Sequence, residues 1–267
     1  MAKFCILIAY DGTDYVGWQR QPSGVSIQGL LEDTLALLDA REVAVAGAGR
    51  TDAGVHALGQ TASFSLTRAI DASTIVRALN AHLPADVRVR AAVDVPEGFH
   101  ARFDARSKRY RYRIWNGAVV SPFERRFVWH IPGPLDVEAM TAAATLVEGR
   151  RDFAAFQSTG GDAATTIRTI HASRIHRVAA ESESGDARGG RLIDYEISGD
   201  GFLRHMVRAI AGSLVEVGQG RRRPEWLLDV MASGDRSACG RSAPASGLFL
   251  VSVGYDRDVF CNPLETL

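Results

Sequence analysis

The stretch Gly47–Ala57, which reads GAGRTDAGVHA, is the most informative part of this 267-residue chain. It places a carboxylate, Asp52, among glycines and two residues after a guanidinium, Arg50. Glycine lets the backbone adopt positive φ and approach another surface closely, and a nearby guanidinium favours the ionised form of a carboxylate. An ionised carboxylate can act as a nucleophile. From these residues alone, a surface turn closed by an Arg50–Asp52 ion pair is the alternative interpretation.

Two phosphate-binding motifs share some of these glycines but fail on spacing. A P-loop requires Lys followed by Ser or Thr where Val55 and His56 stand. A dinucleotide-binding fingerprint requires its third glycine where Asp52 stands. The sequence therefore excludes both kinds of nucleotide-phosphate cradle at this position.

Four further segments stand in order around this stretch, and the five together are highly specific. They resemble the tRNA pseudouridine synthase A family over nearly the whole chain. The resemblance implies isomerisation of uridine to pseudouridine at positions 38, 39 and 40 in the anticodon arm of tRNA, with Asp52 as nucleophile and the target base flipped out. It also implies a homodimer, with one tRNA lying across both subunits. The four segments are YDGTDYVGWQRQ (10–21), FHARFDARSKRYRYRIWN (99–116), GFLRHMVRAIAGSLVEVGQG (201–220) and APASGLFLVSVGYD (243–256).

The charge distribution fits an RNA partner although the formal net charge is zero. Residues 102–126 contain eight basic and two acidic side chains, and residues 204–223 contain five and one. Clustered positive charge matters more for nucleic-acid binding than the sum over the chain. We expect such contacts to weaken steeply with salt.

Composition indicates a protein of the cytoplasm without a metal centre. The three cysteines, Cys5, Cys239 and Cys261, are scattered and odd in number, which argues against a disulfide framework. No Cys and His residues have zinc-like spacing. No apolar run approaches the roughly 18 residues that a membrane span needs, and the run at residues 4–9 is too short for a signal peptide.

Strand and helix patterns alternate irregularly, which favours an α+β fold over repeated βαβ units. We expect a mixed, mainly antiparallel central sheet with helices packed on one side, and two similar halves, 1–104 and 105–267, forming a central RNA-binding cleft. The predicted strands are 3–10, 58–65, 86–95, 107–115, 167–179, 191–198 and 247–255. The predicted helices are 26–40, 71–82, 135–148, 202–218 and 224–233.

Residues 108–115 read KRYRYRIW, and a strand would direct alternate side chains to opposite faces. Tyr110, Tyr112 and Ile114 then share one face, and three arginines share the other. Aromatic side chains can stack on bases and arginines can hold phosphates, but a half-buried strand with tyrosines in the core gives the same pattern. The resemblance implies that Tyr110 packs against the target base; whether the arginines touch the same RNA stays open.

The resemblance assigns roles to further residues, for each of which a structural role is the alternative. Arg50 helps to hold the flipped nucleotide, and Arg208, on the predicted helix 202–218 with Arg204, lies by the nucleophile. Leu248 lines the floor beneath the base. The predicted tRNA-binding residues are Phe99, His100, Arg102 and Arg168.

Three loops complete the interpretation. Residues 158–164 lie where the family contacts tRNA, but here they are rich in glycine and alanine, which puts that contact in doubt. Residues 18–21, WQRQ, are interpreted as scaffold with possible RNA contact. Residues 181–190 are polar and glycine-containing, and we expect an exposed hairpin loop without a chemical role.

The implied reaction needs no redox cofactor and no metal. The N1–C1′ bond breaks, the uracil turns and C5 joins C1′, so nothing is oxidised or hydrolysed overall. The chemistry resembles glycoside cleavage through an oxocarbenium-like centre. Attack of Asp52 on C1′, attack on the base, and removal of the 2′ proton all stay open.

Two other classes of protein fit part of the sequence. A non-catalytic RNA-binding protein could use the same basic and aromatic surface. An N-glycosidase would release free uracil and would need a second carboxylate, for which Asp11 and Asp14 are the nearest candidates. Both match fewer features than the five ordered motifs.

Overall fold

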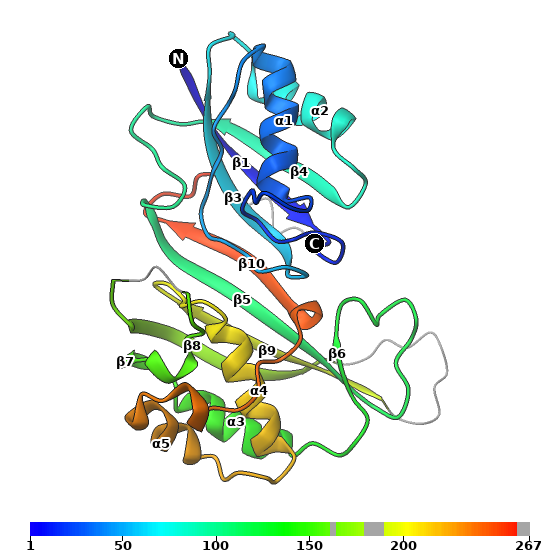
Figure 1. Ribbon diagram of the computed structural model, residues 1–267, viewed down its shortest axis with the longest axis vertical. Coiled ribbons are helices and arrows are strands. Elements are labelled where there is room, and N and C mark those ends of the chain that lie inside the picture. Colours follow the sequence, from blue (N-terminus) through cyan, green and yellow to red (C-terminus); the bar gives the residue numbers. More distant parts are fainter. Residues whose placement is uncertain (161–163, 179–189, 261–267) are drawn as a thin grey trace. The chain divides into compact units, whose positions relative to one another are not determined.

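The computed structural model of the chain describes residues 1–160, 164–178 and 190–260 (Figure 1). The fold is α+β, and the predicted mainly antiparallel sheet is confirmed by the strand ladders. The chain forms two compact units: unit 1 is Met1–Lys108 with Phe249–Leu267, and unit 2 is Arg109–Leu248. The last strand thus groups with unit 1, whereas the predicted halves assign it to the second half. No helix in the described ranges is long and apolar enough to cross a membrane.

Unit 1 is a small sheet in the order β4-β1-β3-β10. β1 pairs antiparallel with both β3 and β4, β10 pairs parallel with β3, and β2 pairs antiparallel with β3. Helices α1 and α2 lie over one side of these strands (Figure 1). The bounds are β1 Ala2–Tyr10, α1 Ile27–Asp39, β2 Ala46–Gly47, β3 His56–Leu66, α2 Ala72–His82, β4 Val87–Asp94 and β10 Leu248–Tyr255.

The β1 strand is buried from Phe4 to Ile8, as expected of a continuous apolar run covered on both faces. Residues 96–104 cross the unit near β3 and β10. The backbone N–H of Ala101 donates to Ser63 Oγ (3.1 Å), and the Tyr255 hydroxyl donates to the carbonyl of Ala101 (2.7 Å). These two bonds fix the segment that carries several predicted RNA-binding residues.

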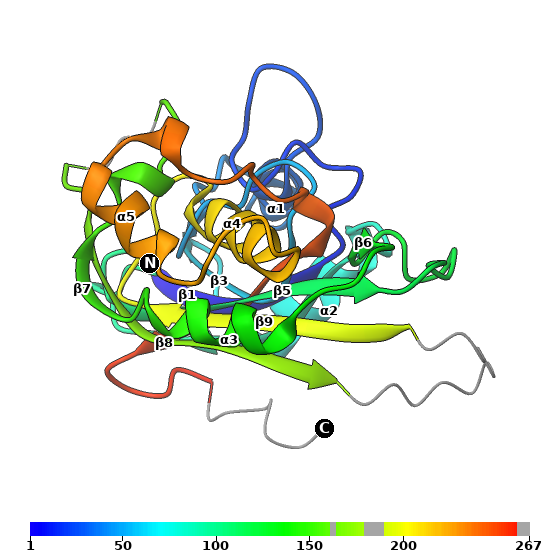
Figure 2. The same cartoon turned by 90° about the horizontal axis from the view of Figure 1, so that it is seen from below.

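Unit 2 contains a second ladder, in which β7 pairs with β8 and β8 with β9, both antiparallel, while β5 neighbours β9 and pairs parallel with β6. Figure 2 shows α4 lying over one face of these strands, and α3 packs on α4 and β8. The bounds are β5 Ala105–Asn116, whose first residues belong to unit 1, β6 Trp129–Ile131, α3 Val137–Thr145, β7 Gly149–Asp152, β8 Ile167–Val178, β9 Arg191–Gly199, α4 Met206–Gly218 and α5 Trp226–Ser233.

The predicted start of α4 at residue 202 is wrong. The helix begins at Met206 because His205 has a left-handed conformation (φ 61°), which no α-helix continues. Arg204 therefore lies outside the helix that carries Arg208, and the two do not share a helix face. The α3 helix is also shorter than predicted, since it begins at Val137 and ends at Thr145. The predicted hairpin loop 181–190 lies almost entirely outside the described residues.

Candidate active site

Asp52 lies on a loop between β2 and β3, here called the Asp52 loop (residues 48–55). At its start, the backbone N–H of Ala48 donates to the Thr61 carbonyl and the Gln60 side-chain amide donates to the Gly49 carbonyl, both at 2.8 Å. At its end, the N–H of Val55 donates to the carbonyl of Asp52 (3.1 Å), and Gly54 has the positive φ, 76°, that this turn requires. The loop is thus anchored to β3 on one side of Asp52 and closed by a turn on the other.

The end of β1 and the segment after it (residues 10–18) hold the same loop from its other side. Thr51 receives two contacts: its carbonyl accepts from the Trp18 N–H (3.0 Å), and its hydroxyl is hydrogen-bonded to that of Tyr10 (2.8 Å). The N–H of Gly54 donates to the carbonyl of Tyr15 (3.3 Å). Asp52 therefore sits between two backbone positions fixed by another segment, which limits the motion of the backbone that carries its side chain.

His56, the histidine of the motif, has a structural position that the sequence does not reveal. Its side chain is buried, its Nδ1 accepts from the N–H of Gly12 (3.0 Å), and its ring stacks on Phe249 of β10 at 4.7 Å between centroids. His56 therefore ties the end of the Asp52 loop to both neighbouring segments of unit 1.

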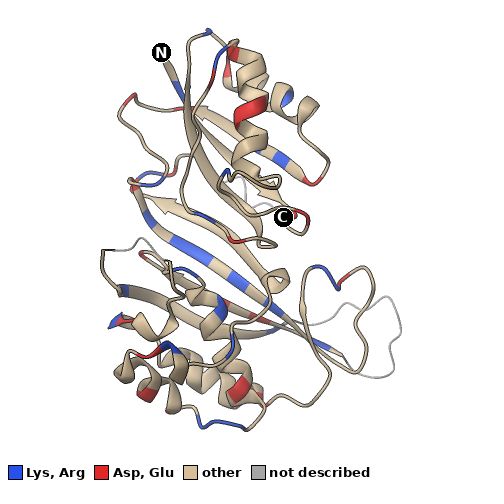
Figure 3. Cartoon of the chain, viewed as in Figure 1, with Lys and Arg blue, Asp and Glu red and all other residues tan. Residues whose placement is uncertain are grey.

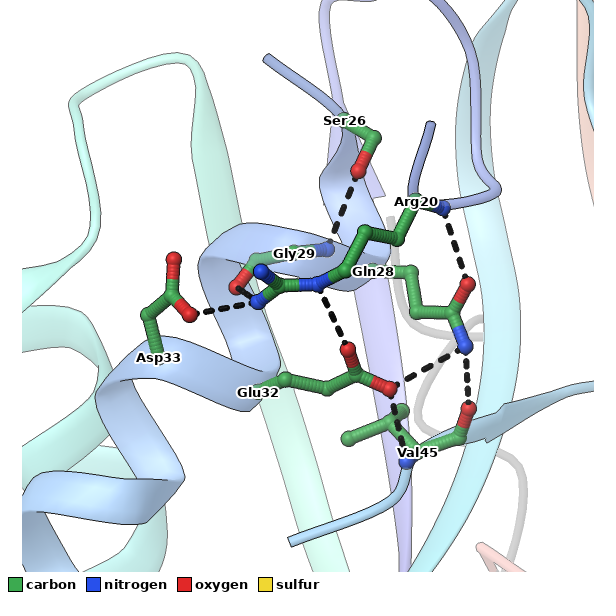
Figure 4. A network of polar contacts seen from close by, with 7 residues as sticks. All are labelled: Arg20, Ser26, Gln28, Gly29, Glu32, Asp33 and Val45. Atoms are coloured by element: carbon green, nitrogen blue, oxygen red, sulfur yellow. Dashed lines mark hydrogen bonds and ion pairs between the residues drawn. The ribbon is translucent and has the colours of Figure 1, made fainter. Parts of the chain in front are cut away.

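Arg20, in the WQRQ segment, is held by side chains and backbone of α1 (Figure 4). Its Nε donates to Glu32 (2.9 Å), and its Nη2 donates to the Gly29 carbonyl (3.1 Å) and is paired with Asp33. These partners raise the pKa of the guanidinium, with Asp33 as the largest cause. The segment that supports the Asp52 loop is thereby fastened to α1, which agrees with its interpretation as scaffold.

Position 12 requires a glycine because the segment after β1 approaches the Asp52 loop closely there. A Cβ built on Gly12 would lie 2.0 Å from the carbonyl oxygen of Val55 and 2.6 Å from its carbon. Both are backbone atoms of the Asp52 loop, so they cannot move aside as a flexible side chain would.

We therefore expect Gly12→Ala to displace the Asp52 loop. Overpacking of this kind costs about 1–3 kcal/mol, so the midpoint of thermal unfolding should fall and turnover should fall with it. Calorimetry and an activity assay measure both quantities. Gly133→Ala is the control, because nothing lies within 4 Å of the Cβ position there; equal behaviour of the two variants would contradict the argument.

In unit 2, β5 shows the predicted alternation. Tyr110, Tyr112 and Ile114 are all buried, with Tyr110 only 7% exposed. The ring of Tyr110 meets Phe202 edge-on, with 5.1 Å between ring centroids. The hydroxyl of Tyr112 donates to the Pro244 carbonyl (2.8 Å).

The arginines of β5 form the basic stripe seen in Figure 3, and two of them have carboxylate partners on β9. Arg111 donates from Nε and Nη2 to Glu196 (2.9 and 2.7 Å). The carboxylate of Asp194 lies between two arginines, 3.4 Å from Arg111 and 3.6 Å from Arg113. Burial raises the pKa of Asp194, and Arg113 and Arg111 oppose that rise. These contacts give both arginines a structural role within unit 2.

The other predicted residues of unit 2 are also fixed locally. Arg208, on α4, donates from Nε to the carbonyl of Ala243 (2.8 Å), and Ala243 N–H donates back to the Arg208 carbonyl (3.0 Å). Arg168 donates from Nη1 to the carbonyls of residues 165 and 167 (2.8 and 2.6 Å). Leu248, at the start of β10, is buried.

Arg204 holds the described start of the loop 158–164. Its Nη1 donates to the carbonyls of Thr159 (3.0 Å) and Gly160 (3.4 Å). Residues 161–163 lie outside the described part of the chain.

The FHAR segment (residues 99–102) belongs to unit 1, and its side chains differ from one another in burial. Phe99 packs on Tyr255, with 5.3 Å between ring centroids. His100 is half-buried, whereas Arg102 is exposed. The candidate residues thus divide between the units: unit 1 contains Arg50, Asp52, Phe99, His100 and Arg102, and unit 2 contains Tyr110, Arg168, Arg208 and Leu248.

The chain is similar to known proteins over most of its length. A sequence model described as tRNA pseudouridine synthase matches residues 6–104 and 143–256. The chain is similar to the tRNA pseudouridine synthase A of Geotalea uraniireducens (43% identical, covering 96% of this chain and 100% of the relative). It is also similar to those of Myxococcus xanthus (46%, covering 96% and 92%) and Acetivibrio thermocellus (41%, covering 96% and 100%).

Proposed function

Because the chain belongs to the tRNA pseudouridine synthase family, it is an isomerase that acts on tRNA uridine, and we propose that its targets are positions 38, 39 and 40 of the anticodon arm. We further propose that Asp52 is the nucleophile and that the target uridine is flipped out of the helix. The observation that carries this proposal is the Asp52 loop, which is anchored by backbone hydrogen bonds at Ala48, Thr51 and Gly54.

A carboxylate on an anchored loop suits this reaction because the uracil released from N1–C1′ cleavage must stay bound until its C5 joins C1′. Cleavage at an anomeric carbon develops positive charge, which an ionised carboxylate stabilises or captures. Uracil leaves as a delocalised anion, so a second carboxylate is not needed to protonate it. Asp11, one of the two other carboxylates weighed from the sequence, accepts from the N–H and hydroxyl of Thr13 (3.0 and 2.6 Å) and lies 3.1 Å from Nδ1 of the buried His56, contacts that give it a structural role in the turn.

The remaining residues are proposed to bind and orient the nucleotide. Tyr110 packs on the uracil and helps to remove the C5 proton, and Leu248 lies beneath the base. Arg50 holds the flipped nucleotide, and Arg208 supports the nucleophile. The exposed position of Arg50 supports its role, since a side chain at the surface can reach RNA. The proposed tRNA contacts are Phe99, His100, Arg102 and Arg168.

Flipping the uridine costs a few kcal/mol of unstacking, which contacts to the RNA backbone must offset. The reacting base must also be shielded from water, because water at C1′ would convert isomerisation into base loss. We propose that a homodimer in the cytoplasm supplies these contacts, with the basic residues of both subunits on one tRNA. The central RNA-binding cleft stays a prediction.

The positional part of this proposal is tested with tRNA transcripts in which uridines 38–40 are replaced by cytidine singly and together. Pseudouridine is mapped by position after incubation with the protein. Loss of product only at the replaced position supports the assignment. Undiminished product in the triple replacement would place the targets elsewhere in the tRNA.

A further inference from the structure

Phe103 holds an aromatic ring in solvent within a hydrogen-bonded turn. Its side chain belongs to the segment 96–104 of unit 1 and is 71% exposed. Two residues earlier, Ala101 is fully buried and hydrogen-bonded to Ser63 and Tyr255. The backbone is therefore anchored directly beside a ring that contributes little to the core.

The turn itself is closed by several hydrogen bonds. Asp104 accepts from the N–H of His100 through its carboxylate (2.7 Å), and its own N–H donates to the carbonyl of His100 (3.1 Å). The Nδ1 of His100 accepts from the N–H groups of Arg102 (3.1 Å) and Phe103 (3.4 Å). The exposed ring therefore projects from a closed turn rather than from a flexible tail, which lowers the entropy lost when a partner binds.

The surroundings of the ring are polar and partly cationic. The ring of Phe103 lies 4.3 Å from that of His100 between centroids, and the guanidinium of Arg102 lies over it at 5.8 Å. His100 also lines a pocket of about 290 Å³ whose other walls include Lys3, Arg41 and the acidic Glu42. Asp39 holds Arg41 by a 2.6 Å ion pair, so this cation is fixed in place.

We propose that Phe103 is a stacking residue for an unpaired base of the tRNA substrate, with Arg102 beside the same nucleotide. Every base has a π face, and an aromatic ring with arginine nearby is the combination that binds single-stranded RNA. A protein partner would require further apolar residues around the ring, whereas the neighbouring side chains Arg102 and Asp104 are charged. This inference rests on the proposed function, because it takes tRNA as the ligand.

The test compares Phe103→Ala, Phe103→Leu and Phe103→Trp for binding to an anticodon stem-loop transcript and to a fully paired RNA duplex. Loss of one stacked base corresponds to roughly a 5- to 150-fold rise in Kd. We expect that rise for Ala and Leu on the stem-loop only, with kcat at saturating tRNA unchanged. Phe103→Trp should keep the wild-type Kd within about 3-fold, and its added fluorescence should be quenched by RNA.

Leu37→Ala is the matched control, because Leu37 lies in the same unit and is 70% exposed but is not aromatic. It should bind like the wild type. An unchanged Kd in Phe103→Ala, or a wild-type Kd in Phe103→Leu, would overturn the stacking role. Wild-type turnover is measured in the same preparation, and its absence would count against the proposed function. Normal turnover together with an unchanged Kd in the Phe103 variants would count only against the stacking role of Phe103.

Discussion

Asp52→Asn should abolish pseudouridine formation while leaving the fold and tRNA binding intact. Asparagine has nearly the same shape as aspartate but cannot act as an ionised nucleophile, and removing a nucleophile reduces turnover by roughly 10⁴-fold or more. The anchoring bonds at Ala48, Thr51 and Gly54 involve backbone groups, so the substitution leaves them in place. Single-turnover release of tritium from uracil C5 in a labelled tRNA measures the loss.

Asp94→Asn is the control for this prediction. Asp94 is an exposed carboxylate at the end of β4 in the same unit, so its amide variant should keep wild-type turnover. The assignment of the nucleophile is wrong if Asp52→Asn turns over as fast as the control while binding tRNA equally well. Circular dichroism of both variants confirms that the comparison concerns folded protein.

Tyr110→Phe should retain the fold and lose roughly 10²- to 10⁴-fold in turnover, the usual contribution of a positioned proton-transfer group. The substitution removes only the hydroxyl, so the edge-on contact with Phe202 is kept. If Tyr110 helps to remove the C5 proton, the loss should appear in kcat rather than in KM. The same tritium-release assay separates the two quantities.

Tyr112→Phe provides a matched pair on the same strand. Its hydroxyl donates to the carbonyl of Pro244 within unit 2, so the variant should lose about 0.5–1.5 kcal/mol of stability and little turnover. The two variants thus separate a chemical role from a structural one. Equal turnover in Tyr110→Phe and the wild type would remove Tyr110 from the proton transfer.

Local patterns in the sequence predict most of the fold. The apolar run of β1 and the alternation in β5 identify their strands because burial on one or both faces leaves a direct mark on residue order. The short strands β2, β6 and β7 were missed, since two to four residues carry no period. The predicted start of α4 is too early because the apolar pattern begins at Phe202, whereas the left-handed backbone of His205 keeps the helix from beginning before Met206.

The candidate site is less accessible to sequence reasoning. The motif identifies Asp52 and its glycines, but much of the loop's support comes from residues 10–18, which meet the loop only through the pairing of β1 with β3. The pairing of Arg111 with Glu196 was also missed, because the two residues are 85 positions apart in the chain. Long-range contacts of this kind leave no periodic signal in a single sequence.

The most direct test of the central claim incubates the protein with an unmodified tRNA transcript tritiated at uracil C5 and measures released tritium, pseudouridine and free uracil together. The account predicts tritium release matched by pseudouridine in the anticodon arm, with no free uracil, and none of this with Asp52→Asn. Free uracil in place of pseudouridine would indicate an N-glycosidase. Tight tRNA binding without either product would contradict the proposed role of Asp52 in catalysis.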